Sequence, residues 1–414
     1  MTTTSESLSI ASGWSRAFRA LRHRNFRLYW SGQIVSQVGI WMQVVAQSWV
    51  VYRLTDSPFM LGLVNFAALL PVVPISLLGG VISDRFPRRT LIILTESIMT
   101  VQAIVMAFLI WLNMIQVWHI ILLSFILGAA SALEQPARLA FVLDVVGQND
   151  LSNAVAVSSS AYNTARIIGP SIAGLLIASV GEAACFLING VTYLGVILAL
   201  LIIRLPPQTV HSADQKLMGS LVNGLKYTWD NRVIRGLMLI VALASFLTIP
   251  YIALMPVFAK DVLHAGPDVL GFLLTAVGIG AILGGLIVAC LQEGRRGLWL
   301  VLFNVIGSVF LLIFCISGSI PLSMVFVMLL GSSNAIRQTL ANSLIQLNTA
   351  EAYHGRVMSV FNLLLNGMSR VGALLIGAMA EFINAPIALG LSALLGVIFG
   401  LFILYRMPVL RRLR

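Results

Sequence analysis

Charged residues are scarce in this chain, and their scarcity excludes an ordinary soluble fold. Only 10% of the 414 residues are charged, whereas 59% are hydrophobic. Soluble globular domains carry roughly a quarter charged residues. We therefore expect an integral membrane protein whose apolar surface faces lipid.

Residues that bind metals or perform covalent chemistry are also sparse. The three cysteines lie scattered in apolar segments and give neither a disulfide framework nor metal-ligand spacing. The five histidines fall at segment ends or in loops, and the sequence contains no Cys–His or Ser–His–Asp grouping and no phosphate-cradling loop. The sequence thus predicts no enzyme, no metal and no cofactor.

The N-terminal region lacks the pattern of a cleavable signal peptide. Polar Met1–Ser9 and basic Arg16–Arg27 precede the first apolar run. We expect residues 1–27 to form a cytoplasmic basic segment, and the first apolar run to remain as a permanent anchor.

Long apolar runs dominate the rest of the chain. A membrane-spanning helix needs about 20 apolar residues. Twelve runs of that kind occur, at 28–52, 58–82, 90–112, 117–143, 152–179, 183–204, 234–259, 267–291, 298–317, 320–347, 355–383 and 385–406. The one long link predicts an N-terminal six-helix bundle at 28–204, a cytoplasmic link at 205–233, a C-terminal bundle at 234–406 and a basic cytoplasmic tail at 407–414.

Lysine and arginine gather on one side of the predicted membrane. If the N-terminus is cytoplasmic, 21 of the 26 basic residues fall in cytoplasmic segments. The other five are Arg53, Lys260, Arg166, Arg337 and Arg370. This bias predicts that both termini are cytoplasmic. Topology therefore explains the net charge of +11, and no nucleic-acid partner is expected.

The two halves resemble one another. Gly79-Gly80 is matched by Gly284-Gly285 after 205 residues. At an offset of 203 residues the matched pairs are Gly128 and Gly331, Gln135 and Gln338, Asn163 and Asn366, Gly169 and Gly372, and Gly174 and Gly377. Duplicated bundles around a central cavity are typical of transporters. Chance matches among 34 glycines are the alternative.

The loop after the second apolar run carries a specific motif. The segment Gly80-x-Ile82-Ser83-Asp84-Arg85-x-Pro87-Arg88-Arg89 resembles the G-x-L-A-D-R-x-G-R-[RK] loop of the major facilitator superfamily, with Ile82, Ser83 and Pro87 as departures. The resemblance covers essentially the whole chain. It implies an all-α major facilitator fold of twelve transmembrane helices, arranged as two six-helix repeats around a central cavity.

The resemblance also implies a cytoplasmic latch. Asp84 would face the N-terminus of the eleventh helix, where an anion is favoured. Arg85, Arg88 and Arg89 would accompany it, with Asp144 at the end of the fourth helix as a partner. The alternative is a basic loop that only orients the protein.

A second motif lies in the predicted fifth helix. Gly169, Pro170 and Gly174 match the superfamily's antiporter motif G-x8-G-x3-G-P-x2-G-G, and alanines replace its other glycines. Small residues let helices approach closely, so ordinary packing is the alternative.

Charged side chains within the predicted helices are costly and usually functional. We expect Glu134 and Arg337 to face each other across the cavity as proton site, substrate site or inner gate; the alternative is a static pair of Glu134 with Arg138. Arg166 and Arg370 would bind an anionic substrate group or brace their own half, with bracing favoured. Further cavity candidates, whose mixture suits an amphipathic organic substrate, are Gln37, Trp41, Asn334 and Gln338.

Two regions, Gly32–Tyr52 and Gly128–Leu143, are similar to the bacterial branch that includes the enterobactin exporter and macrolide efflux proteins. The resemblance implies a proton-coupled exporter of amphipathic small molecules such as drugs, siderophores or metabolites. We expect a monomer in the bacterial plasma (inner) membrane whose partners are lipid, substrate and protons. The alternatives are an importer or lipid-flipping transporter of the same fold, and a non-transporting receptor or scaffold.

Overall fold

The computed structural model describes residues 18–72, 74–75, 86–203, 217–291, 294–407, 411 and 413. Within these residues the chain is almost wholly helical and has no β-strand. The N-terminal bundle comprises η1 (Arg19–Arg22), α2 (Arg24–Thr55), α3 (Pro58–Leu69), α5 (Arg88–Trp111), α6 (Val117–Val146), α7 (Gln148–Ser179) and α8 (Glu182–Ile202).

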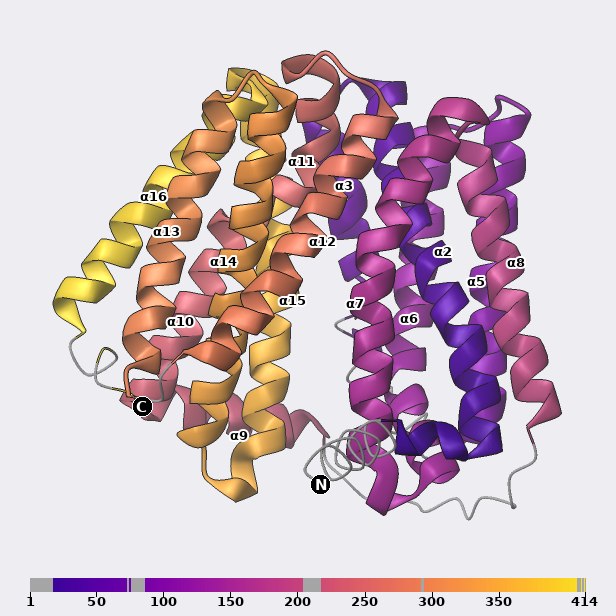
Figure 1. The fold of residues 1–414 in the computed structure, drawn as a ribbon, viewed down its shortest axis with the longest axis horizontal. Coiled ribbons are helices and arrows are strands. Elements are labelled where there is room, and N and C mark those ends of the chain that lie inside the picture. Colours follow the sequence, from indigo (N-terminus) through magenta and orange to yellow (C-terminus); the bar gives the residue numbers. More distant parts are fainter. Residues whose placement is uncertain are drawn as a thin grey trace, which may run out of the picture.

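The remaining helices follow the central link. Helix α9 (Leu217–Asp230) precedes the C-terminal bundle. That bundle comprises α10 (Arg232–Leu247), α11 (Tyr251–Val257), η2 (Phe258–Val262), α12 (Pro267–Cys290), α13 (Arg296–Ile316), α14 (Ile320–Leu347), η3 (Glu351–Tyr353), α15 (His354–Ile383) and α16 (Ala385–Arg406). Figure 1 shows the two bundles side by side. Residues 204–216 lie outside the description, so the exact domain boundaries remain a prediction.

Ten helical segments of the described chain are long and apolar enough to cross a membrane, which makes this a multi-pass membrane protein. Two of the twelve predicted spans are not among these ten. Helix α3 covers only 12 described residues, and 76–82 of that predicted span lie outside the description. Helix α7 has 32 residues but is not apolar enough to be counted among the ten, because its middle carries Ser158, Ser159, Ser160, Asn163, Thr164 and Arg166.

The seventh predicted span is broken rather than continuous. Helix α10 ends at Leu247, and α11 starts again at Tyr251. Pro250 stands directly before α11, and a proline lacks the N–H that would continue the helix. The apolar run predicted the span, but not this interruption within it.

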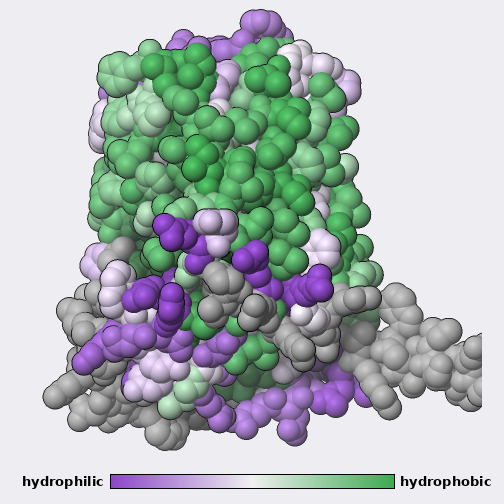
Figure 2. Space-filling model, turned by 90° about the vertical axis from the view of Figure 1, so that its left-hand side faces the viewer, coloured by the Kyte–Doolittle hydropathy of each residue, from purple (hydrophilic) through white to green (hydrophobic). Residues whose placement is uncertain are grey.

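Both bundles start and finish at one end of the molecule. The start of α2, the whole of α9 and the end of α16 lie in the lower part of Figure 1. We call this end of the molecule the terminal end. Figure 2 shows an apolar belt over most of the height of one side, with hydrophilic residues gathered mainly toward the terminal end and a thin cap at the opposite end. This distribution suits a protein that spans a bilayer.

The two bundles meet in pairs of contacts that repeat the internal duplication. A Cβ atom added to Gly174 of α7 would lie 2.7 Å from the carbonyl oxygen of Pro267 in α12. A Cβ atom added to Gly377 of α15 would lie 2.6 Å from the carbonyl oxygen of Pro58 in α3. Gly174 and Gly377 are one of the pairs matched in sequence, so equivalent glycines make equivalent contacts. Chance matching does not explain this.

Polar pairs also join the bundles at the opposite end. The Tyr52 hydroxyl donates a hydrogen bond to the Asp261 carboxylate, and Lys260 forms an ion pair with Asp56. The Ser57 hydroxyl donates to Glu381, with 2.7 Å between Oγ and Oε2. The opposite end is therefore held shut in this conformation.

Candidate functional site

A cavity of about 720 Å³ lies between the bundles in the half of the molecule nearer the terminal end. Five helices supply its walls: α2, α6, α7, α12 and α14. Its lining residues are Tyr29, Trp30, Gln33, Gln37, Arg138, Leu139, Val142, Val155, Ser158, Ser159, Ala161, Tyr162, Asn163, Arg166, Ala281, Ile282, Gly285, Leu286, Ala335, Gln338 and Thr339. Its volume suits a drug-sized organic molecule.

The polarity of α7 is explained by this cavity. Its lining residues include Ser158, Ser159 and Asn163, and the helix packs through Ala165 and Gly169 on its buried face. Non-apolar side chains at membrane depth are tolerated where they face a water-filled cavity. The polar residues that make α7 less apolar than a typical span therefore include residues that line the cavity.

The antiporter-like motif lies at the closed end of the cavity. A Cβ atom added to Gly169 would lie 2.6 Å from the Cβ of Trp41 in α2, and Gly174 abuts α12. Next to Pro170, the Ser171 and Thr275 hydroxyls lie 2.7 Å apart, and Thr275 donates to the Ile167 carbonyl at 3.0 Å. The motif therefore sits in a tight three-helix junction that joins the bundles.

Glu134 and Arg138 form an ion pair within α6. The Arg138 Nε donates to the Glu134 carboxylate at 2.9 Å, and the two residues are one helical turn apart. Glu134 is only 2% exposed, whereas Arg138 reaches the cavity. The expectation that Glu134 faces Arg337 is wrong for this conformation, and the alternative of a pair within the bundle holds.

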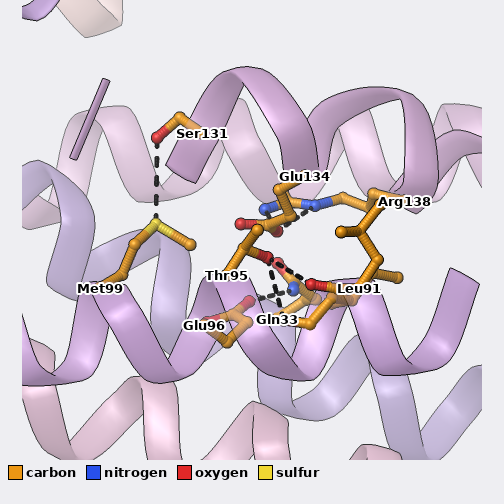
Figure 3. A network of polar contacts seen from close by, with 9 residues as sticks. Gln33, Leu91, Thr95, Glu96, Met99, Ser131, Glu134 and Arg138 are labelled. Carbon is orange, nitrogen blue, oxygen red and sulfur yellow. Dashed lines mark hydrogen bonds and ion pairs between the residues drawn. The ribbon is translucent and has the colours of Figure 1, made fainter. Parts of the chain in front are cut away.

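Glu96 of α5 lies beside this pair. Its side chain is 1% exposed, and one carboxylate oxygen accepts a hydrogen bond from Gln33 of α2 at 3.2 Å. The other oxygen has no hydrogen-bond partner within the described residues. Figure 3 shows Gln33, Glu96, Glu134 and Arg138 pointing toward one another from three helices. Because Gln33 also lines the cavity, it connects Glu96 to the site.

Arg337 is buried in α14 rather than exposed to the cavity. It is 2% exposed and donates through Nη2 to the Asn334 side chain at 3.2 Å. Gln338, the next residue, lines the cavity, whereas Asn334 is not among the lining residues. The tenth predicted helix therefore contributes to the site, with its arginine turned into the protein.

Some of the other cavity candidates line the cavity and others do not. Gln37 and Arg166 line the cavity. Trp41 lies behind it and packs edge-to-face on the lining residue Tyr162, with 5.8 Å between the ring centroids. Arg370 in α15 is partly buried and is not a lining residue.

Half of the predicted latch lies outside the described residues, namely Gly80, Asp84 and Arg85. Arg88 and Asp144 form an ion pair, with 2.6 Å between Nη1 and Oδ1, as expected of these partners. Arg89 donates to the Leu201 carbonyl at 3.0 Å. These contacts lie within the N-terminal bundle, so a latch between bundles remains a prediction.

Comparison with known proteins places the chain among transporters. The family model described as "Transmembrane secretion effector" matches residues 15–412. The chain is 24% identical to the staphyloferrin A transporter of Staphylococcus aureus, covering 86% of this chain and 89% of the relative. It is also 24% identical to macrolide efflux protein A of Streptococcus pyogenes, covering 87% and 90%. It is 26% identical to the multidrug efflux pump Tap of Mycobacterium tuberculosis, covering 92% of both chains.

Solved structures with the same fold are transporters as well. The nucleoside transporter NupG superposes with a TM-score of 0.74 at 13% identity, covering 92% of this chain and 98% of NupG. At an identity this low, the similarity shows the fold alone and not the function. The fold, the loop motif and the family match agree: the chain belongs to the transmembrane secretion effector family (MFS_3) of the major facilitator superfamily.

Proposed function

We propose that this protein is a proton-coupled exporter of amphipathic small molecules that works by alternating access. The terminal end would face the cytoplasm of a bacterium, in whose plasma membrane the chain would act as a monomer. The observation that carries the proposal is a cavity confined to the terminal half, with the opposite end held shut by inter-bundle contacts. Substrate would enter from the cytoplasm in this conformation.

The direction of transport is supported by the relatives. Two of the three that we compared are named for efflux, of macrolides and of multiple drugs, and the third is named for transport of staphyloferrin A. A fold by itself does not reveal direction. Export is therefore the part of the proposal that rests on similarity rather than on the geometry of the cavity.

The proton site would be the cluster of Glu96, Glu134 and Arg138. The carboxyl groups of Glu96 and Glu134 are buried near the guanidinium of Arg138, and Glu134 forms the ion pair with that guanidinium. A buried carboxyl group without a cationic partner favours its neutral form, and a second carboxylate nearby adds to the effect. Among the described residues Glu96 accepts a hydrogen bond from the Gln33 amide and forms no ion pair, so it is the group that we expect to carry the proton.

The position of Gln33 gives the proton a route to the cavity. Its amide contacts Glu96 on one side, and the residue lines the cavity on the other. When the bundles rock, the cavity that Gln33 lines would close at the terminal end, and water would leave the side of Gln33 that faces it. Glu96 would then be covered in one conformation and hydrated in another, as coupling requires.

Everted membrane vesicles test this proposal. With the lumen acidified, vesicles that hold the wild-type protein should accumulate an exported dye, and Glu96→Gln should abolish the dependence on the pH gradient. Exchange of dye across the membrane without a gradient should survive in this variant, because it needs the cavity but not the proton. The matched control is Glu351→Gln, an exposed acid in η3.

Two results would contradict the proposal. Gradient-driven accumulation that is unchanged in Glu96→Gln would remove Glu96 as the proton carrier. Accumulation only when the lumen is alkaline would show that the protein moves substrate together with the proton, as an importer does.

A further inference from the structure

Helix α9, at the terminal end of the C-terminal bundle in Figure 1, leaves two large apolar side chains exposed. Leu225 is 51% exposed and Trp229 is 67% exposed. They are four residues apart and therefore share one face of the helix. Trp229 also lies three residues before the apolar span Arg232–Val262. Exposed leucine and tryptophan at the edge of a span are typical of a helix that lies in a membrane interface.

The other face of α9 is fixed to the C-terminal bundle. The ring of Tyr227 stacks on that of Tyr353 in η3, with 4.3 Å between the ring centroids, and the Tyr227 hydroxyl accepts a hydrogen bond from the Ala350 N–H at 3.2 Å. A Cβ atom added to Gly224 would lie 3.0 Å from the Cβ of Arg356 in α15. These contacts hold the exposed face of α9 in one orientation.

Two arginines lie beside this face, on the side of α10 that meets lipid. Leu239 of α10 is 45% exposed within an apolar span, so its side of the helix faces the hydrocarbon. Arg232 and Arg235 precede Leu239 by seven and four residues, a spacing that places all three on one side of a helix. A helix rises 1.5 Å per residue, so Arg235 lies about 6 Å nearer the terminal end than Leu239. The arginines therefore stand where the hydrocarbon gives way to the headgroups.

The charge at this corner is positive and one of its arginines is held in place. The Arg235 guanidinium lies over the Trp229 ring, with 5.6 Å from Cζ to the centroid, and its Nη1 donates to the Trp229 carbonyl at 3.1 Å. In the part of the chain that the structure describes, neither Arg232 nor Arg235 forms an ion pair. Exposed Lys226 adds a third cation, and Asp230, the acid beside them in the chain, offsets only part of the charge.

We infer that the corner of α9 and α10 binds the headgroup of an anionic phospholipid in the leaflet at the terminal end. Arg232 and Arg235 donate to the lipid phosphate, which guanidinium groups bind through charge-assisted hydrogen bonds, while Leu225 and Trp229 contact the acyl chains near the headgroup. A soluble acidic protein would also match the charge. The arginines, however, share a side of α10 with lipid-facing Leu239, where the bilayer excludes a soluble partner.

Quenching of Trp229 fluorescence by lipids with brominated acyl chains tests the inference. The full-length protein is placed in phosphatidylcholine nanodiscs that contain increasing fractions of brominated phosphatidylglycerol or brominated phosphatidylcholine. The contribution of Trp229 is the difference between the wild type and Trp229→Phe. The titrations should show phosphatidylglycerol bound about 25-fold more tightly, because each of two basic residues near an anionic surface contributes about 5-fold.

Variants separate this site from the general positive charge of the terminal end. Arg232→Gln and Arg235→Gln should each reduce the preference to about 5-fold, and together they should abolish it. Arg232→Lys and Arg235→Lys keep the charge and should retain most of the preference. The matched control is Arg24→Gln with Arg27→Gln, which removes two arginines of the same spacing from the start of α2 and should keep the full preference. Unchanged quenching of the other tryptophans shows that each variant is folded.

Three results would overturn the inference. Equal quenching of Trp229 by both lipids would show that the corner does not select an anionic headgroup. No quenching by either lipid would place the exposed face of α9 in water, where a soluble partner could bind it. A preference that survives Arg232→Gln combined with Arg235→Gln would show that these arginines do not hold the lipid. The measurement involves neither substrate nor a pH gradient, so its result is independent of the proposed export function.

Discussion

The glycine contacts between the bundles give the sharpest prediction about conformation. Gly174 and Gly377 each lie against a backbone carbonyl of the other bundle, at distances of 2.7 and 2.6 Å for an added Cβ atom. Real Cβ atoms do not approach an oxygen so closely. In Gly174→Ala or Gly377→Ala the backbones must separate by about half an ångström, and overpacking of this kind costs about 1–3 kcal/mol.

This cost falls on one conformation only. The contacts with Pro267 and Pro58 exist where the opposite end is shut, and they are lost when that end opens. The equilibrium between the two conformations should therefore shift toward the one open at the opposite end by about 5- to 150-fold. Alanine also raises helix propensity by about 1 kcal/mol over glycine, but this gain applies to both conformations.

Spin-label distances can measure the shift. Val180, directly after α7, and Phe382, in the last turn of α15, are exposed and lie at the same end of the molecule, opposite the terminal end. Spin labels at these two positions report how far the bundles are separated at that end. Both alanine variants should enlarge the long-distance population. Gly195→Ala and Gly390→Ala are the controls, because nothing lies within 4 Å of a Cβ atom at either position. If the contact variants give the same distances as the controls, these glycines do not set the conformational equilibrium.

Two further predictions concern the charged groups of the N-terminal bundle. Glu134→Gln leaves Arg138 without its partner and should lower the free energy of unfolding toward the lower end of about 3–5 kcal/mol, since Arg138 reaches the cavity. An unchanged unfolding midpoint together with lost pH dependence of transport would instead assign the proton to Glu134. Asp84→Asn should leave membrane insertion intact and slow transport severalfold in vesicles, and unchanged rates would refute the latch implied by the loop motif.

The architecture could be predicted from the sequence because a bilayer imposes simple rules. Apart from the run at 58–82, whose residues 76–82 lie outside the description, the apolar runs predicted the helix ends within a few residues. The glycines matched at an offset of 203 residues make matched contacts. The break before Tyr251 was missed, since Pro250 lies in a run whose average composition stays apolar. Composition over a window cannot show a local interruption that neighbouring helices support.

The site was predictable only where its contacts are local in sequence. Glu134 and Arg138 are one helical turn apart, so the sequence could predict their ion pair as an alternative. Glu96 was not identified as part of the site, because its partner Gln33 lies 63 residues away on another helix. Arg337 was expected to face Glu134, but the sequence does not state how far a helix is rotated. Within the described residues Arg337 Nη1 is buried without a hydrogen-bond acceptor, which is likewise visible only in three dimensions.

Energetics make the proposed exchange feasible for an organic anion. Each elementary charge that crosses a membrane potential of 100 mV changes the free energy by about 2.3 kcal/mol. Export of a monoanion in exchange for one entering proton moves two positive charges inward. We therefore expect that the membrane potential drives export of an anionic substrate more strongly than export of a neutral one.

Reconstitution into liposomes tests the central claim, exchange of substrate for protons, most directly. The purified protein is sealed into liposomes with an acidic lumen, and uptake of 1-pyrenesulfonamide, a neutral fluorescent probe, is followed after the pH gradient is imposed and after it is reversed. An antiporter moves substrate into the acidic compartment whatever its orientation in the bilayer, so the probe should accumulate in the acidic lumen and leave it on reversal, and it should do neither in liposomes without the protein. Accumulation of a probe in the alkaline compartment, or no response to either gradient, would contradict proton-coupled export.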